Sequence, residues 1–160
     1  MAVKHYDPKT FTSRGSIGYL LKMTHTLMHD RGDEVFAPHD LSFVQWITML
    51  KLREGHALTA SDLCRAMRHD NGALTRILDQ LEDRGFVVRK RSQQDRRVVE
   101  LELTADGERK LDALLPELVS QLNAVLGDFS KAEFAELTRL LNKLMTNLQT
   151  GPAGSQGVSS

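Results

Sequence analysis

The chain has 160 residues and no net charge, because 21 lysines and arginines balance 21 aspartates and glutamates. With 41% hydrophobic residues it can build one core, but its apolar runs fall short of the roughly 20 residues that a membrane helix needs. The N-terminus lacks the apolar centre of a secretion signal, and one cysteine excludes an internal disulfide framework. We therefore expect a cytoplasmic protein without a membrane partner.

An apolar stripe at helical spacing predicts a first helix. It comprises Ile17, Leu20, Leu21, Thr24, Leu27 and Met28. We expect Gly32 and Pro38 to break this helix. Ser42 and Gln45 then form a capping box that begins a second helix over residues 42–54.

Two further helices follow, separated by a turn of three residues. Thr59 and Asp62 predict the start of the third helix, and Asp70 can cap a fourth over residues 71–84. Gly85 should end the fourth helix. The fourth helix is expected to bury one face, formed by Leu74, Ile77, Leu78 and Leu81.

A β-hairpin is predicted next. Residues 86–91 are rich in β-formers, and residues 98–103 alternate valine or leucine with glutamate, which is typical of a half-buried strand. The segment RKRSQQDRR, residues 89–97, places five cations and one acid at the hairpin tip.

Two helices complete the pattern. Thr104 begins a helix in which Pro116 should cause a kink or a division. Its predicted inner side holds Leu111, Leu114, Leu115, Leu118, Leu122, Val125 and Leu126. Ser130 and Glu133 cap a last helix with a heptad seam of Phe134, Leu137, Leu141, Leu144 and Leu148. Such a seam favours a homodimer, although two helices that fold back on one monomeric core are the alternative.

These elements predict a mainly α fold with a winged helix-turn-helix. We expect an N-terminal arm at 1–14 and a disordered tail at 150–160. The winged lobe covers 59–103, and a helical dimerisation region that includes helix two covers 15–58 and 104–149.

The exposed side of the fourth helix fits a DNA major groove, and the basic hairpin can reach a minor groove. Against this, the lobe holds nine basic and eight acidic residues, and Asp79 and Asp83 share the outer helix face with Arg76. A winged helix that binds protein and not DNA is therefore the alternative, and a subunit of an enzyme encoded elsewhere is a third. The chain has no Gly-rich phosphate loop or nucleophile elbow, so we expect neither an enzyme nor a cofactor.

The segments LSFVQWITMLKL and LTASDLCRAMRHDNGALTRILDQLEDRGFVVRKRSQQDRRVVELELTADG resemble the MarR (multiple antibiotic resistance regulator) family. The resemblance covers roughly residues 15–148. It implies a homodimeric regulator on pseudo-palindromic DNA, and we predict a repressor rather than an activator. By this resemblance Thr75 and Arg76 contact DNA, Arg97 enters the minor groove, and Asp95 holds the wing in shape.

Combining pattern and resemblance, we predict two sets of site residues. The DNA contacts are Asn71, Gly72, Thr75, Arg76, Arg89, Arg91, Arg96 and Arg97. A pocket for a small aromatic or phenolic effector, which releases DNA in many members, would be lined by Tyr19, Met23, His39, Phe43, Trp46 and Met49. Ordinary core packing is the alternative for each of these six residues.

Three further residues are not assigned a site. His25 and His29 have the i, i+4 spacing of metal ligands, but no glutamate lies between them and no cysteine completes a set, so we predict no metal. Cys64 is expected to be a small core residue. By resemblance, oxidation-sensing members carry a cysteine near the N-terminus, where this chain has none.

Overall fold

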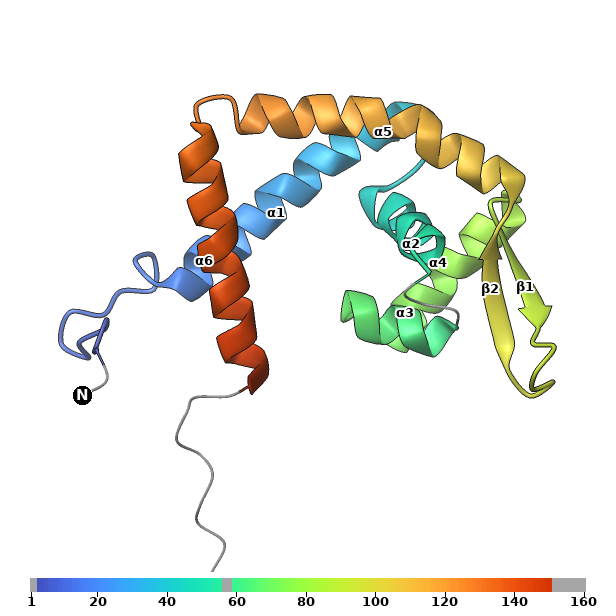
Figure 1. Cartoon of the computed structure of the whole chain (residues 1–160), viewed down its shortest axis with the longest axis horizontal. Coiled ribbons are helices and arrows are strands. Elements are labelled where there is room, and N and C mark those ends of the chain that lie inside the picture. The colour runs from blue at the N-terminus through green and yellow to red at the C-terminus, as the bar shows by residue number, and fades with distance from the viewer. Residues whose placement is uncertain (1–2, 56–58, 151–160) are drawn as a thin grey trace, which may run out of the picture. The chain divides into compact units, whose positions relative to one another are not determined.

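The computed structural model describes residues 3–55 and 59–150, and its elements follow one another as shown in Figure 1. They are α1 Ile17–Phe36, the 3-10 helix η1 Ala37–His39, α2 Phe43–Arg53, α3 Ala60–Met67, α4 Asn71–Asp83, β1 Val87–Arg91, β2 Val99–Leu103, α5 Ala105–Val125 and α6 Lys131–Thr150. The predicted class is confirmed: a mainly helical fold with one two-stranded antiparallel sheet among the described residues. The chain divides into two compact units, and the boundary between them lies in the sequence between Val119 and Ser120.

Polar side chains at the helix starts satisfy backbone N–H groups that have no partner inside the helix. The capping boxes of α2 and α3 are both present, and Asp70 Oδ1 accepts from Ala73 N at 2.9 Å. The predicted helix starts are therefore confirmed. The other N-terminal side chains that accept backbone N–H groups are Ser16 of α1, Thr104 of α5 and Ser130 of α6.

The predicted helix break at Gly32 is wrong, whereas α1 does end just before Pro38, which lies in η1. α1 runs through Gly32 to Phe36, and a Cβ at Gly32 would lie 2.6 Å from the Phe43 ring. Glycine is needed at this position because an aromatic ring packs on the helix backbone, and the helix continues. α5 also runs unbroken past Pro116, where buried leucines on both sides stabilise it. Of the two predicted effects of Pro116, the division of the helix is wrong, and the kink stays a prediction.

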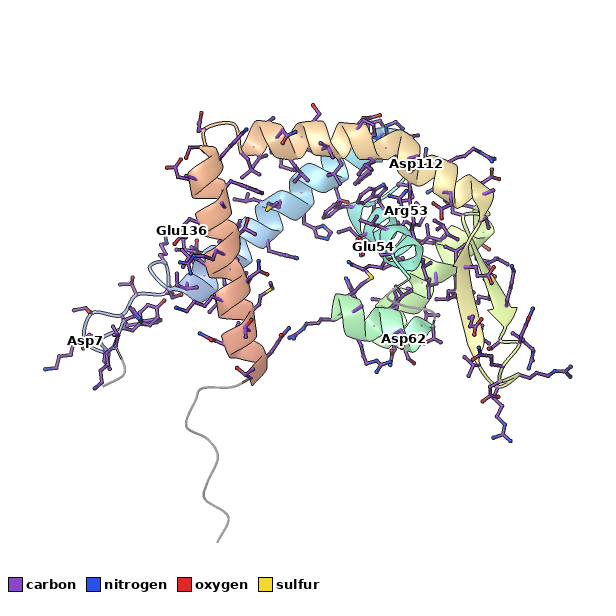
Figure 2. All side chains as sticks on the ribbon, viewed as in Figure 1. Asp7, Arg53, Glu54, Asp62, Asp112 and Glu136 are labelled. Carbon is purple, nitrogen blue, oxygen red and sulfur yellow. The ribbon has the colours of Figure 1, made fainter. Side chains whose placement is uncertain are left out.

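The core lies in the first unit, between α1, α2, α3, α4, the sheet and the first part of α5. Its most deeply buried apolar side chains include Phe36, Met49, Leu63, Leu74, Leu78, Leu81, Leu111 and Leu114. Arg53 Nη1 of α2 donates to Asp112 Oδ1 of α5 at 2.6 Å, and the two side chains lie beside each other in Figure 2. This contact fixes α2 against α5 at the edge of the core.

The hairpin pairs Val87 with Leu103 and Arg91 with Val99. Val87 and Leu101 are buried, whereas Val99 is exposed. The alternation in β2 therefore marks an inner side only near the base of the hairpin, because the tip projects beyond the core. Figure 1 shows the hairpin next to α4, which contacts β1.

The apolar seam of α6 has no cover within the described residues, since no α6 residue is buried. The same is true of much of the α1 stripe, where Ile17, Leu20 and Leu27 are about half exposed. Thr150 ends α6, so it is not part of the tail, and the remainder of the predicted tail lies outside the described residues. None of the described helices is long and apolar enough to cross a membrane.

Candidate nucleic-acid interface

The turn between α3 and α4 sets the direction of α4. Arg68 ends α3 in the left-handed region with φ 51°, and His69 N donates to Cys64 O at 3.2 Å. Asp70 then caps α4, and the N–H of Ala73 is the main cause that holds the pKa of Asp70 below its usual value. The N–H of Gly72 and the positive charges of His69 and Arg76 lower this pKa further. The turn therefore presents the first residues of α4 in a defined orientation.

α4 has one buried and one exposed side, as predicted from its spacing. Leu74, Leu78 and Leu81 lie in the core, almost without exposure to solvent, whereas Ile77, also predicted for this face, is half-buried. The predicted contact residues of this helix lie on its exposed part: Asn71, Gly72, Thr75 and Arg76. The Thr75 hydroxyl donates to the Asn71 carbonyl at 2.7 Å, which leaves the hydroxyl oxygen free to accept from a ligand.

The wing tip is an ordered turn. Asp95 Oδ1 accepts from Arg97 N at 2.9 Å, and Val98 N donates to Asp95 O at 2.9 Å. Ser92, which is buried, accepts from Gln94 N through its Oγ at 3.2 Å. These short-range bonds hold the tip in one conformation. Asp95 thus lies in the turn and contacts its backbone.

The five cations of the basic segment do not form one cluster. Arg91 Nη1 donates to the Arg96 carbonyl at 3.1 Å, and Lys90 pairs with Glu102 across the hairpin. Within residues 59–150 the side chains of Arg96 and Arg97 have no hydrogen bond or ion pair and are exposed. The free positive charge is therefore concentrated at the extreme tip of the wing.

Arg89 forms ion pairs with two acids of α4. Its Nη2 lies 2.6 Å from Asp79 Oδ1, and its Nη1 pairs with Glu82, so both of its partners belong to α4. The hydrogen bond to Asp79 is the main cause that raises the pKa of Arg89 above its usual value. Arg89 was predicted to contact DNA, and in this arrangement its charge is already paired with two carboxylates. Neither partner was predicted from the sequence: Asp79 was expected only to be an unfavourable charge on the outer helix face, and Glu82 was not assigned a role.

The residues of the predicted effector pocket are divided between core and surface. Trp46 and Met49 are buried in the core, and the Trp46 ring stacks on Phe36 with centroids 5.3 Å apart. The Phe43 ring also stacks on Phe36, with the two ring centroids 5.9 Å apart. Nε1 of Trp46 is buried and has no hydrogen-bond partner among the described atoms.

The other three predicted pocket residues are less buried. His39 Nε2 lies 3.1 Å from Glu117 Oε2 of α5. Met23 is half-buried and Tyr19 is exposed on α1. The ring contacts thus join Phe43 and Trp46 through Phe36, but no hydrogen bond, ion pair or ring contact of the described residues joins Tyr19, Met23 or His39 to that stack.

The three residues that were not assigned a site are His25, His29 and Cys64. The rings of His25 and His29 are 5.6 Å apart, and His29 Nδ1 lies 3.7 Å from Asp33 Oδ2. The described residues contain no group of three or more metal-ligating side chains. Cys64 is a free thiol, half-buried on α3.

Comparison with known proteins agrees with this arrangement. The sequence profile of the MarR family matches residues 41–99. The organic hydroperoxide resistance transcriptional regulator of Bacillus subtilis is 32% identical over 111 residues, which cover 69% of this chain and 72% of that protein. The transcriptional repressor YetL of the same organism is 29% identical over 129 residues, covering 79% of this chain and 74% of that protein.

A solved structure gives the same result. A cysteine-to-serine variant of MarR from E. coli, crystallised with operator DNA, superposes with a TM-score of 0.72 at 28% identity, covering 80% of this chain and 92% of that one. These relatives are regulators and not enzymes. The chain belongs to the MarR family of winged-helix, DNA-binding transcriptional regulators.

Proposed function

We propose that the protein is a homodimeric repressor, acting in the cytoplasm, that binds a pseudo-palindromic operator through α4 and the wing. The observation that carries this proposal is the exposed first turn of α4 beside a wing whose free arginines lie at its tip. A recognition helix normally presents its N-terminal residues to base edges in the major groove. A protein-binding module would have no need of unpaired arginines at a projecting tip.

The contacts divide into two kinds. Arg76 donates to a guanine edge, where a bidentate pair reads one base, and Thr75 adds a second polar contact. Asn71 and Gly72 let the α4 backbone approach the DNA closely. The wing residues are assigned to the backbone and the minor groove: Arg91 and Arg96 contact phosphates, Arg97 enters the narrow groove, and Asp95 keeps the turn in shape.

The dimer is supported by apolar surface that lacks cover. Leu137, Leu140, Leu141 and Met145 of α6 are each more than a third exposed, as are several residues of the α1 stripe. Burying such side chains stabilises association by about 25 cal/mol per Å² of apolar area. We therefore assign residues 15–58 and 104–149 to the dimerisation region and 59–103 to the DNA-binding lobe. Sedimentation of the wild type and of Leu141→Glu tests this, since the variant should dissociate at concentrations where the wild type is a dimer.

A small aromatic or phenolic effector is proposed to bind near the Phe36–Phe43–Trp46 stack, with Tyr19, Met23, His39 and Met49 as further candidate contacts. The unpartnered Trp46 Nε1–H supports this, because a buried N–H without an acceptor is costly and a ligand oxygen would satisfy it. The effector must prefer a dimer whose recognition helices do not match the groove spacing. Trp46 is the single tryptophan of the chain, so its fluorescence reports binding directly.

The function is tested by fluorescence anisotropy with DNA from upstream of the protein's own gene, at two salt concentrations, with unrelated DNA as the control. Tight, selective binding that weakens steeply with salt is expected, because the affinity comes from phosphate contacts. If binding is equally weak for both DNAs, a preferred site is selected from a pool of random duplexes in a second experiment. If that selection also returns no preferred site, the proposed function is wrong.

A further inference from the structure

We propose that Arg89 is an internal clamp that fixes the wing to the recognition helix and shields Asp79 from the DNA, and that it does not itself contact phosphate. This inference rests on the DNA-binding function proposed above. It assigns to one member of the basic segment a positioning role, which differs from the role of the arginines at the tip.

The clamp consists of contacts that the guanidinium group and the backbone N–H of Arg89 make with α4. The two guanidinium nitrogens Nη1 and Nη2 pair with Glu82 and Asp79, which are separated by about one turn of the helix. The backbone N–H of Arg89 also donates to Glu82 Oε1, at 3.3 Å. Because two carboxylates engage two different nitrogens, the guanidinium plane is fixed in orientation. β1 is thereby joined to α4 by side chain and main chain together.

The clamp also changes the charge that DNA meets. Asp79 is about half exposed and follows Arg76 by one turn, so it lies on the side of α4 proposed to face the groove. An unpaired carboxylate there would repel phosphates. The 2.6 Å contact with Arg89 compensates that charge. The wing therefore supplies the positive charge that neutralises Asp79 of the recognition helix. The position of the wing and the charge on this helix thus depend on the same ion pair.

Arg96 provides a matched comparison. It carries the same charge as Arg89 and lies seven residues further along the same hairpin, but its side chain has no partner within residues 59–150. Removing either charge changes the net charge of the lobe equally. Only the removal of Arg89 leaves two carboxylates without their partner and removes the ion pairs that join β1 to α4.

The structural half of the proposal is tested without DNA. Amide hydrogen exchange is measured on the hairpin of the full-length wild type, Arg89→Gln and Arg96→Gln, after thermal unfolding confirms that each variant is folded. Exchange in β1 and β2 should be up to about fivefold faster in Arg89→Gln, as expected when an ion pair of this exposure is lost. It should be unchanged in Arg96→Gln. Wild-type exchange in Arg89→Gln would overturn the clamp.

The electrostatic half is tested by a double-mutant cycle of operator affinity, with Asp79→Asn made in the wild type and in Arg89→Gln. If Arg89 neutralises Asp79, removing this acid should raise affinity about fivefold in Arg89→Gln and not in the wild type. If Arg89 contacts phosphate, Asp79→Asn strengthens binding equally in both backgrounds, which would refute the inference. A wild type that binds no duplex would contradict the proposed function, and hydrogen exchange would still decide whether the clamp exists.

Discussion

Replacing Gly107 with alanine should destabilise the protein, although alanine is the better helix former. Gly107 lies in the first turn of α5, where the helix meets the turn between α4 and β1. A Cβ at this position would lie 2.3 Å from the Phe86 carbonyl oxygen and 3.0 Å from Leu103 Cδ1. The nearest atom belongs to the backbone, so a side-chain rotation cannot relieve the contact.

The magnitude follows from two opposing terms. Helix propensity favours alanine by about 1 kcal/mol. Against this, overpacking a tight site typically costs about 1–3 kcal/mol. Moving α5 away would also strain two bonds of Thr104: its N donates to Phe86 O at 3.0 Å and its Oγ1 to Gly85 O at 2.6 Å. We therefore expect Gly107→Ala to lower the free energy of unfolding by about 1–2 kcal/mol.

Urea unfolding, followed by circular dichroism at one protein concentration, measures this effect, with Gly18→Ala as the matched control. Gly18 also lies in a helix, but a Cβ there would meet no atom within 4 Å. Gly18→Ala should therefore stabilise the protein by about 0.5–1 kcal/mol. The two substitutions should act in opposite directions. If Gly107→Ala stabilised the protein as much as the control, the close approach of α5 to Phe86 would not exist in solution.

Three further predictions concern the interface. Arg76→Ala should cost about 1–3 kcal/mol of binding and relax base preference at one position per half-site, measured with singly substituted operators; an unchanged preference would contradict its role. Arg97→Ala should weaken binding most at sites flanked by A·T pairs, and an equal loss at G·C-flanked sites would argue against minor-groove insertion. The pKa of Asp70 is depressed in the fold, so its stabilising contribution is present above the ordinary value of 3.8 and is lost as pH falls through the folded value. The stability difference between wild type and Asp70→Asn should therefore shrink on acidification. Urea unfolding between pH 6 and 3, roughly the range in which carboxylates titrate, measures this difference. A difference that stays constant over this range would show that the Ala73 contact is absent.

The helix starts could be predicted because the responsible groups are close in sequence. Ser42 with Gln45 and Thr59 with Asp62 bond across three residues, so the pattern alone contains both partners. The buried side of α4 follows from a spacing of three and four residues in the same way. Local patterns also identified the exposed half of the candidate site, because the side of α4 opposite its leucines has to face solvent.

The predicted break at Gly32 and the predicted division at Pro116 were wrong, because local propensity was applied where tertiary contacts decide. Gly32 reads as a helix breaker until the Phe43 ring is seen to require its missing side chain. Pro116 removes one hydrogen bond from α5, but the burial of Leu114 and Leu118 on either side outweighs that loss. In both cases, the compensating contact is with residues that the local pattern does not contain.

The sequence by itself determined the order and type of the elements, the capping residues and the basic character of the hairpin, since these depend on neighbours within one or two turns. Tertiary structure alone decided which charges are free. Arg89 and Arg96 are equivalent in the sequence, yet one is paired with Asp79 and Glu82 while the other has no side-chain partner within residues 59–150. The difference arises because an ion pair depends on the distance between two side chains, and only the packing of β1 against α4 brings Arg89 within reach of these acids.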